Sequence, residues 1–219
     1  MRTAVIIPCY NEAATIGPVV AAVAAYGVPV VVDDAGTDGS AELAARAGAE
    51  VVRHERNRGY DGALQSGFER AAALGAEAAV TIDADGQLDP ALLGRLLDPI
   101  RENRAELVLG ARPAAARVSE AAFNLYARLR FGVADILCGQ KAYRMDLFRE
   151  HGRFDGVRSI GTELALWALR RGVRWTAVPV PVRPRQGASR MGSVLRAEAR
   201  IFRALGQALA ADLRGGRWA

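Results

Sequence analysis

Short apolar runs alternate with amphipathic segments through the first half of the chain. Val28–Val32 is a β-branched run typical of a strand, whereas Ile16, Val19 and Val23 recur at the spacing of one helix face. These two patterns predict strands at 4–7, 28–32, 50–53, 78–82 and 106–110, and helices at 15–25, 40–47, 62–74 and 90–103. The alternation favours an α/β fold: a mostly parallel sheet with helices on both faces, whose ligands bind at the carboxyl ends of strands.

The pattern changes after residue 110. Helices are expected at 118–131, 161–171 and 193–212, a strand at 174–180, and irregular structure at 135–144. The sequence shows neither an internal repeat nor a long linker. We therefore expect one domain over residues 1–192, with halves 1–110 and 111–192, followed by a helix and tail over 193–219.

The longest uncharged stretch covers the 20 residues between Glu12 and Asp33, which is long enough for a membrane span. Pro18, Gly27 and Pro29 interrupt it, and its first part has a helical period while its second part is strand-like. The stretch is therefore interpreted as a helix and a strand of the domain, and any membrane contact is expected to be peripheral.

Charge is distributed unevenly. The net charge of +5 combines 7 Arg against 14 Asp and Glu in residues 1–100, a net of −7, with a net of +12 over residues 101–219. Lys141 is the sole lysine, so 28 of the 29 basic residues are arginine. The asymmetry indicates an anionic partner or membrane for the second half and a cation for the first; a coding bias toward arginine is the alternative.

Cysteine and histidine are scarce. Cys9 and Cys138 are the only cysteines, which favours a reduced, cytoplasmic protein, and the N-terminal apolar run is too short for a signal peptide. His54 and His151 lie in no recognisable motif, and both are expected on the surface.

The strongest local signal is a carboxylate pair after an apolar strand. Asp83 and Asp85 follow that strand at a spacing of two residues, and the carboxamide of Gln87 comes two residues later. An oxygen-rich cluster of this kind suits Mg²⁺ or Mn²⁺, which completes its shell with water and substrate phosphates. The alternative is an acidic turn in which Gly86 makes the bend.

Two further polar loops follow predicted strands. Asp33 and Asp34 end one strand before a glycine-containing turn, and the segment 8–12 follows the first strand. Because the carboxyl ends of parallel strands share one edge of a sheet, the three loops converge. Adjacent carboxylates there can accept hydrogen bonds from a base or a ribose.

The ordered set of these motifs resembles family 2 glycosyltransferases of the GT-A (Rossmann-like) fold. The likeness rests on Ile7–Glu12, Val32–Asp34, Thr37–Gly39, Asn57–Gly59 with Ala63, and Asp83–Gln87. A second set is similar to dolichol- and polyprenyl-phosphate mannose and glucose synthases: Gly110–Arg112, Asp135, Cys138–Arg144, Thr162–Leu164, Val178–Val180 and Arg185–Arg190. The resemblance covers residues 4–195.

The resemblance implies a metal-dependent, inverting transfer of a hexose from a nucleotide sugar, GDP-mannose or UDP-glucose, to a polyprenyl phosphate in the membrane. Residues 1–110 would then bind the nucleotide sugar and 111–192 the acceptor. The implied site consists of Pro8, Tyr10, Glu12, Asp33, Asp34 and Arg58 for the nucleoside, Asp83, Asp85 and Gln87 for Mg²⁺ or Mn²⁺ and the diphosphate, and Arg112, Arg144, Arg185 and Ser189 for phosphates.

The chain departs from the family pattern in several places. Ala35-Gly36 stands where Gly-Ser is usual, Arg190 replaces a lysine, and Asp61 brings a charge into a glycine-rich loop. The register of the late arginines is also open by two positions, so that Arg183 is an alternative to Arg185.

The chemistry of the acceptor decides whether a general base is needed. A phosphate monoester is largely ionised near pH 7 and needs none. A hydroxyl acceptor, as in glycolipid or polysaccharide synthesis, would require a carboxylate such as Asp135 or Glu163 to take its proton. We therefore count Asp85, Arg112, Asp135 and Glu163 as the candidate catalytic residues and keep both acceptor classes open.

The last predicted helix is amphipathic. One face carries Leu195, Phe202, Leu205 and Leu209, and another carries Arg196, Arg200, Arg203 and Gln207. Such a helix either lies in a membrane interface or closes the core with a solvated basic face. The excess of arginine favours a peripheral position at the inner, cytoplasmic face of a membrane. The sequence does not set an oligomeric state.

Parts of the sequence also fit three other functions. The segment 79–88 also resembles the first motif of haloacid-dehalogenase-type phosphatases, but it follows three strands and has Gln87 in place of a threonine. A nucleic-acid-binding module would fit the pI of about 9.7 but leaves the acidic loops unexplained, so no nucleic-acid partner is expected. A nucleotide-sugar sensor without catalysis would not need Asp83, Asp85 and Gln87.

Overall fold

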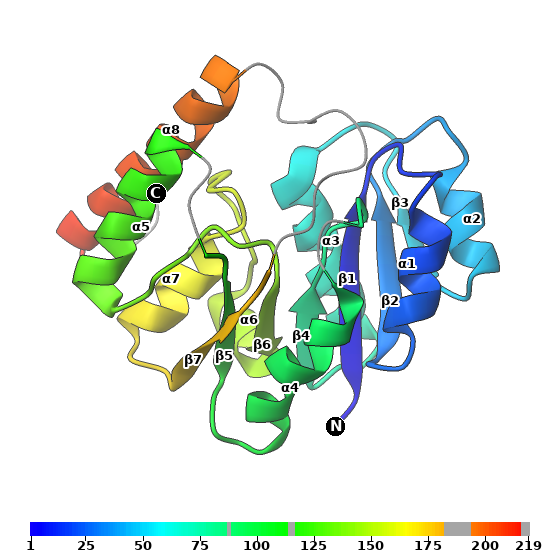
Figure 1. Cartoon of the computed structure of the whole chain (residues 1–219), viewed down its shortest axis with the longest axis horizontal. Coiled ribbons are helices and arrows are strands. Elements are labelled where there is room, and N and C mark those ends of the chain that lie inside the picture. Colours follow the sequence, from blue (N-terminus) through cyan, green and yellow to red (C-terminus); the bar gives the residue numbers. More distant parts are fainter. Residues whose placement is uncertain (87–88, 114–116, 182–193, 216–219) are drawn as a thin grey trace.

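A single mixed sheet organises the chain (Figure 1). The computed structural model describes residues 1–86, 89–113, 117–181 and 194–215. The strands are β1 Thr3–Cys9, β2 Val28–Asp33, β3 Glu50–Arg53, β4 Ala78–Thr81, β5 Leu107–Ala111, β6 Lys141–Arg144 and β7 Trp175–Pro179, in the order β3-β2-β1-β4-β6-β5-β7. The helices are α1 Ile16–Val23, α2 Ser40–Arg46, α3 Gly59–Ala73, α4 Leu93–Arg101, α5 Val118–Phe131, α6 Met145–His151, α7 Glu163–Arg170 and α8 Val194–Leu213.

The sheet is mostly parallel, as predicted. β1 pairs in parallel with β2 and β4, β2 with β3, and β5 with β7. β6 is the exception, because it runs antiparallel between β4 and β5. The prediction of irregular structure over 135–144 was wrong at its end, and α6 was missed. The segment Lys141-Ala142-Tyr143-Arg144 contains no β-branched residue and begins and ends with a basic one, so it lacks the apolar pattern that marked the other strands.

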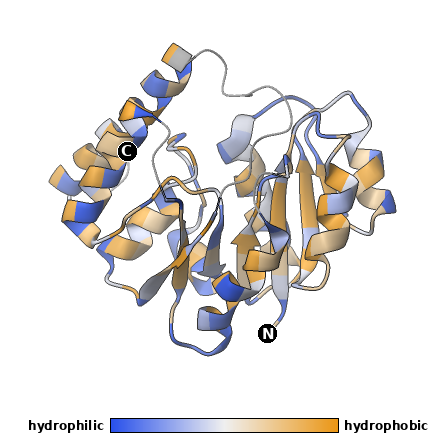
Figure 2. Cartoon of the chain, viewed as in Figure 1, coloured by the Kyte–Doolittle hydropathy of each residue, from blue (hydrophilic) through white to orange (hydrophobic). Residues whose placement is uncertain are grey.

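Helices cover both faces of the sheet. α1, α2 and α4 contribute Val20, Ala44 and Leu96 to one buried cluster, whereas α3, α5 and α7 pack in the other. The apolar strand residues lie between these layers (Figure 2). α3 approaches β1 closely at Gly67, where a Cβ would lie 2.3 Å from Cγ2 of Ile6, so only glycine fits there. The predicted α/β class is confirmed.

The C-terminal helix α8 closes the second cluster with a face of small residues. Ala197, Ile201, Ala204 and Ala208 are at most 2% exposed. Asp212 near its end accepts hydrogen bonds from Arg170 Nε at 2.6 Å and from the Tyr126 hydroxyl at 2.8 Å. α8 therefore belongs to the packed domain. Among the described helices, none is long and apolar enough to cross a bilayer.

Candidate active site at the carboxyl edge of the sheet

The loops after β1 and β2 are linked to each other. Asn11 Oδ1 accepts a hydrogen bond from Thr37 N at 2.8 Å, and Ser40 Oγ accepts one from Glu12 N at 2.8 Å. Both loops leave the same edge of the sheet because β1 and β2 are parallel. The structure therefore brings Pro8, Glu12 and the 42% exposed Tyr10 next to the loop that follows Asp33.

Ala35 shows how the chain accommodates its departure from the family pattern. Its φ is 62°, in the left-handed region that glycine adopts without strain. The next peptide is fixed, because Gly36 N donates to Asp33 Oδ1 at 3.2 Å. Asp33 also borders a hollow of about 340 Å³ with Arg53, His54 and Glu55 among its lining residues, and the end of β2 thus offers space for a planar group.

Asp34 holds the next loop in place. Its carboxylate accepts hydrogen bonds from Arg58 N at 2.7 Å and Gly59 N at 2.8 Å, which are the amides at the start of α3. It also contacts His54 Nδ1 at 2.6 Å. The side chain is 5% exposed, so its role in this structure is to join β2 to α3. Any contact of Asp34 with a nucleoside would come through the loop that it positions.

His54 is not a surface histidine, contrary to expectation. Its side chain is 4% exposed and bridges the Asp34 carboxylate to Ser66 Oγ, which lies 2.9 Å from Nε2. The sequence held no motif for this contact because Asp34 and Ser66 lie on different elements, β2–α2 and α3.

Asp83 and Asp85 follow β4 at the same edge. The Tyr60 hydroxyl donates to Asp83 Oδ1 at 3.2 Å, and the opposite side of this carboxylate faces Gly139, where a Cβ would lie 2.7 Å from Oδ2. Gly139 thus leaves room beside the carboxylate that a larger residue would fill. Gln87 lies outside the described residues.

The donor set fits a hard divalent cation. It consists of carboxylate oxygens, which Mg²⁺ and Mn²⁺ prefer, and Mg²⁺ sites commonly use only one or two carboxylates together with substrate phosphates. Within the described ranges, no group of three or more His, Cys, Asp or Glu side chains gathers in a way that would hold a metal by itself. Asp83 and Asp85 would therefore share such an ion with a bound diphosphate.

β6 brings Lys141, rather than Arg144, to this edge. Because β6 is antiparallel, Arg144 pairs with Ala78 at the start of β4 and hydrogen-bonds Asn103 and Asp146 at the opposite edge. Lys141 Nζ donates to Gly161 O at 3.0 Å, and burial lowers its pKa. The structure therefore places Arg144 at the opposite edge of the sheet from Arg112, which follows the end of β5.

Arg112 and Asp135 form a bidentate ion pair past the end of β5. Arg112 Nε lies 2.7 Å from Asp135 Oδ2 and Nη2 lies 3.0 Å from Oδ1, and Glu120 lies 3.6 Å from the same guanidinium. Although burial opposes it, the hydrogen bonds and charge of Arg112 lower the pKa of Asp135. An ionised carboxylate with a low pKa is a weak proton acceptor.

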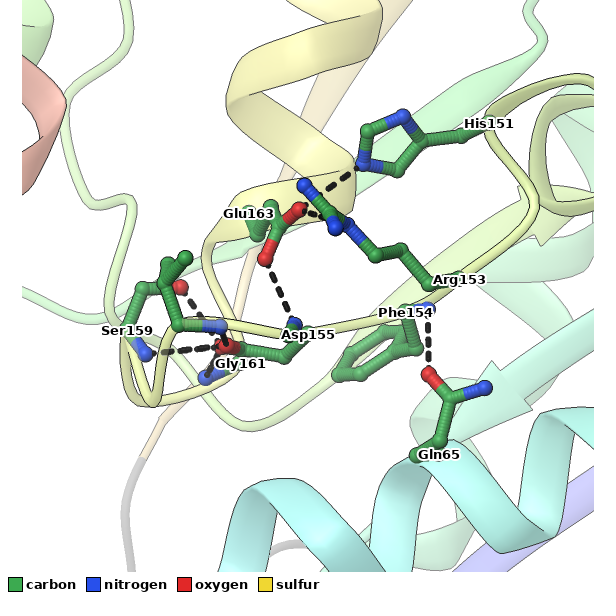
Figure 3. A network of polar contacts seen from close by, with 10 residues as sticks. Gln65, His151, Arg153, Phe154, Asp155, Ser159, Gly161 and Glu163 are labelled. Atoms are coloured by element: carbon green, nitrogen blue, oxygen red, sulfur yellow. Dashed lines mark hydrogen bonds and ion pairs between the residues drawn. The ribbon is translucent and has the colours of Figure 1, made fainter. Parts of the chain in front are cut away.

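Glu163 lies in a separate network (Figure 3). Its side chain is fully buried and accepts from His151 Nε2 at 3.0 Å, Arg153 Nε at 2.6 Å and Gly156 N at 2.7 Å. Burial opposes ionisation, but these partners lower the pKa of Glu163. Glu163 therefore fixes the segment before α7, and His151, stacked on Trp167 at 4.7 Å, is likewise not a free surface side chain.

A second buried carboxylate pair lies beside this network. Asp155 accepts hydrogen bonds from Val157 N, Ser159 N and Gly161 N, which holds Arg158 and Ile160 at positive φ. Asp61 at the start of α3 is 5% exposed, and its Oδ1 has no hydrogen-bond partner among the residues that the structure describes. Burial and the charge of Asp155 raise the pKa of Asp61 to about 6. Arg185 and Ser189, as well as the alternative Arg183, lie outside the described residues.

Comparison with known proteins identifies the family of the chain. The family model described as glycosyl transferase family 2 matches residues 4–152, more than half of the chain. The chain is a family 2 glycosyltransferase. It is 33% identical to an undecaprenyl-phosphate mannosyltransferase of Micrococcus luteus, over 91% of each chain. It is 31% identical to a polyprenol monophosphomannose synthase of Mycolicibacterium smegmatis, over 89% of this chain and 83% of that protein.

Solved structures agree with the fold of this glycosyltransferase. Mannosyl-3-phosphoglycerate synthase from Rubrobacter xylanophilus superimposes with a TM-score of 0.76 at 22% identity, covering 98% of this chain and 74% of that one. Glucosyl-3-phosphoglycerate synthase from Mycobacterium tuberculosis, in complex with Mn²⁺, UDP and phosphoglyceric acid, gives 0.72 at 23%, covering 100% and 79%. The resemblance to family 2 glycosyltransferases and the predicted GT-A architecture are confirmed.

Sequence reasoning missed two side chains that the structure places at this candidate site. Tyr60 follows Arg58-Gly59 directly, and its position one residue into α3 was a usable signal. Lys141 belongs to the Cys138–Arg144 motif, but it lies at this edge of the sheet only because β6 runs antiparallel to β4, which the sequence did not reveal.

Proposed function

We propose that this glycosyltransferase transfers a hexose, in the first place mannose, from a nucleotide diphosphate sugar to a polyprenyl phosphate, with inversion at the anomeric carbon. Two relatives above 30% identity carry names of this type, one an undecaprenyl-phosphate mannosyltransferase and the other a polyprenol monophosphomannose synthase. The donors to test are GDP-mannose and UDP-glucose.

One observation supports a phosphate rather than a hydroxyl acceptor. The two carboxylates predicted as general bases, Asp135 and Glu163, are both ion-paired with arginine and have lowered pKa values. Glu163 is also completely buried. Neither is suited to removing a proton from a hydroxyl, whereas an ionised phosphate oxygen needs no base.

The proposed reaction balances without a further reactant. An oxygen of the acceptor phosphate forms the bond to the anomeric carbon from the face opposite the donor diphosphate. The bond from that carbon to the diphosphate oxygen breaks, and its electron pair leaves with the nucleoside diphosphate. A divalent cation, when bound, would neutralise the charge that develops on this leaving group.

The residues of the chain then have the following roles. Asp83 and Asp85, with Gln87, would hold Mg²⁺ or Mn²⁺, and Tyr60 orients Asp83 by a hydrogen bond. The nucleoside would lie over the linked loops, which contribute Pro8, Tyr10, Glu12 and Asp33, while Asp34 positions Arg58. Arg112, with Arg185 and Ser189, would face the phosphates. Arg144 and Glu163 have no part in this scheme.

The acceptor determines where the enzyme would work. A polyprenyl phosphate is held in a bilayer by its chain, so the enzyme would act as a peripheral protein at the cytoplasmic face of the membrane. The net charge of +12 over residues 101–219 supports this position, since it would attract anionic lipid headgroups.

The test combines two donors with two acceptors that differ by one phosphate. Purified protein is incubated with Mn²⁺, GDP-mannose or UDP-glucose, and either undecaprenyl phosphate or undecaprenol in detergent. We expect a glycolipid only with the phosphate, more with GDP-mannose, and with the anomeric configuration inverted relative to the donor by NMR. Transfer to undecaprenol at an equal rate would overturn the phosphate assignment.

A further inference from the structure

We propose that the outer sides of α5 and α8 form one surface that docks on an anionic lipid bilayer. The inference deepens the proposed function, because it rests on a lipid-phosphate acceptor and assigns the part of the molecule that meets the lipid. We call this surface the α5–α8 face and define it by seven apolar residues: Val118, Leu125, Leu129, Leu195, Phe202, Leu209 and Leu213.

Exposed apolar side chains are concentrated on these two helices. In the part of the chain that the structure describes, ten large apolar side chains are at least 36% exposed, and seven of them form the α5–α8 face. Leu129, Leu195 and Leu213 are 80%, 81% and 90% exposed. Single exposed leucines are ordinary in soluble proteins, whereas a cluster of this kind marks a binding surface.

The exposed residues lie in stripes that are distinct from the faces buried in the core. Leu195, Phe202 and Leu209 are seven residues apart and therefore lie on one side of α8. The core side of α8 is a separate row of small residues around Ala204, which is 0% exposed. α5 likewise has separate exposed and buried sides, since Leu125 and Leu129 point away from the buried Phe123. The outward stripes are therefore not needed to close the fold.

Polar contacts hold the two stripes side by side. Glu198 Oε2 accepts from Ser119 N at 3.0 Å at the start of both helices, and Asp212 Oδ2 accepts from the Tyr126 hydroxyl at 2.8 Å further along. The helices thus run in the same direction, next to each other at one end of the molecule (Figure 1). Both exposed stripes therefore belong to the same end of the molecule, on two neighbouring helices.

The charges on these helices indicate an anionic partner. The acidic residues Glu120, Glu198 and Asp212 each bond another group of the protein. Every exposed charged residue in the described part of α5 and α8 is an arginine: Arg128, Arg130, Arg196 and Arg203. Apolar side chains beside arginines match a bilayer interface, in which acyl chains lie below anionic headgroups.

A second copy of the chain is a poorer occupant. A symmetric dimer through this face would bring Arg128, Arg196 and Arg203 of both copies together, whereas the acidic side chains in the described part of α5 and α8 already bond groups of their own chain. A lipid surface has the opposite charge. Docking by α5 would also bring Arg112, a few residues before α5, toward the headgroups that carry the acceptor phosphate.

The test is flotation of the full chain with vesicles. We expect the wild type to float with vesicles of phosphatidylcholine and phosphatidylglycerol, and much less with phosphatidylcholine alone. Two double variants, Leu125→Ser with Leu129→Ser on α5 and Phe202→Ser with Leu209→Ser on α8, should each lower the bound fraction at least fivefold. Leu43→Ser on α2, which is 36% exposed, is the matched control and should float like the wild type.

The outcomes separate the inference from the proposed function. The docking inference is overturned if both double variants float like the wild type. It is also overturned if light scattering shows a dimer that the variants abolish while flotation stays unchanged. Transfer to a short, water-soluble prenyl phosphate tests the chemistry without a bilayer. Variants that keep this transfer but lose flotation support the docking face, whereas a wild type that floats but transfers to no prenyl phosphate contradicts the proposed function alone. Circular dichroism verifies that every variant is folded.

Discussion

Arg112 and Asp135 face each other in a two-pronged ion pair that joins the end of β5 to the segment before β6. In addition to the two side-chain contacts, Arg112 N donates to Asp135 Oδ2 at 3.1 Å. Asp135 is 4% exposed, so this is a largely buried pair, in which each charge depends on the other. Two residues predicted as separate catalytic groups thus form one unit.

Replacing Asp135 by Asn tests this unit. The substitution leaves the Arg112 guanidinium without its main counter-charge, and we expect a loss of about 3–5 kcal/mol in the free energy of unfolding, measured with urea. Because the pKa of Asp135 is lowered, its stabilisation is present above the unfolded-state pKa and is lost only as the pH falls through the folded-state pKa. The difference from wild type should therefore be constant between pH 5.5 and 8. A difference that appears only in alkali would contradict the pairing.

Tyr60 is expected to tune cation binding through Asp83. Removing its hydroxyl in Tyr60→Phe takes away the hydrogen bond that orients the carboxylate, and we expect about tenfold weaker Mn²⁺ binding by calorimetry in the presence of the nucleoside diphosphate. Tyr126→Phe is the matched control, because that hydroxyl bonds Asp212 on α8. Equal Mn²⁺ affinity in Tyr60→Phe and wild type would show that the hydrogen bond does not matter for the metal.

Asp85 carries the sharper test of metal dependence. We expect Asp85→Asn to lower transfer about a hundredfold or more at saturating Mn²⁺, because a ligand that helps to neutralise the leaving diphosphate is lost, while the melting temperature changes little. Asp98→Asn, on the exposed side of α4, serves as the control. An undiminished rate in Asp85→Asn would remove Asp85 from the metal site.

The sequence predicted the parts of the fold that repeat a clear period. The β1–β5 strands and their helices have apolar patterns long enough to be recognised, and the strand-end carboxylates follow from the parallel order. β6 was missed because Lys141–Arg144 contains no β-branched residue, and its strand conformation comes from pairing with β4 and β5. That omission also misplaced Arg144, since a reversed strand moves its last residue to the opposite edge.

The partners of buried charged groups were equally beyond the sequence. His54 and His151 show no local motif, and the Thr162–Leu164 motif that contains Glu163 does not specify its partners, yet all three side chains are buried against groups from other elements. Desolvation makes an unpaired buried charge costly, so these contacts are necessary once the fold forms, but nothing in the spacing specifies them. The last helix packs its alanine face on the core, which agrees with one of the two alternatives left open by its pattern, while Leu195, Leu209 and Leu213 are exposed. Contact of this helix with a membrane stays a prediction.

Asp61, the unexpected charge in the glycine-rich loop, should destabilise the protein at neutral pH. Its pKa is raised to about 6 by burial and by Asp155, so ionisation is more costly in the folded than in the unfolded state. The contribution of Asp61 to stability should therefore fall as the pH rises from about 4 to about 6. We expect Asp61→Asn to gain about 1–3 kcal/mol above that window and nothing below it, by urea unfolding at several pH values.

Asp155, the carboxylate beside Asp61, is expected to have the opposite effect on stability. Asp155→Asn should destabilise the protein, because Asp155 accepts the amide hydrogens of Val157, Ser159 and Gly161 that shape the loop before α7. If Asp61→Asn were destabilising as well, the carboxylate of Asp61 would have a favourable partner, and its raised pKa would be contradicted.

Replacing Glu163 by Gln tests whether this side chain stabilises the fold or acts as a general base. Glu163→Gln weakens the contacts with His151 and Arg153 in the core, and we expect a loss of about 1–3 kcal/mol in stability by thermal and urea unfolding. Because the side chain is completely buried, the turnover rate per folded molecule should stay within about twofold of wild type at low temperature. Glu150→Gln, in an exposed pair with Arg171, controls for charge removal. A Glu163→Gln protein with unchanged stability but no transfer would restore Glu163 as the general base and, with it, the hydroxyl acceptor.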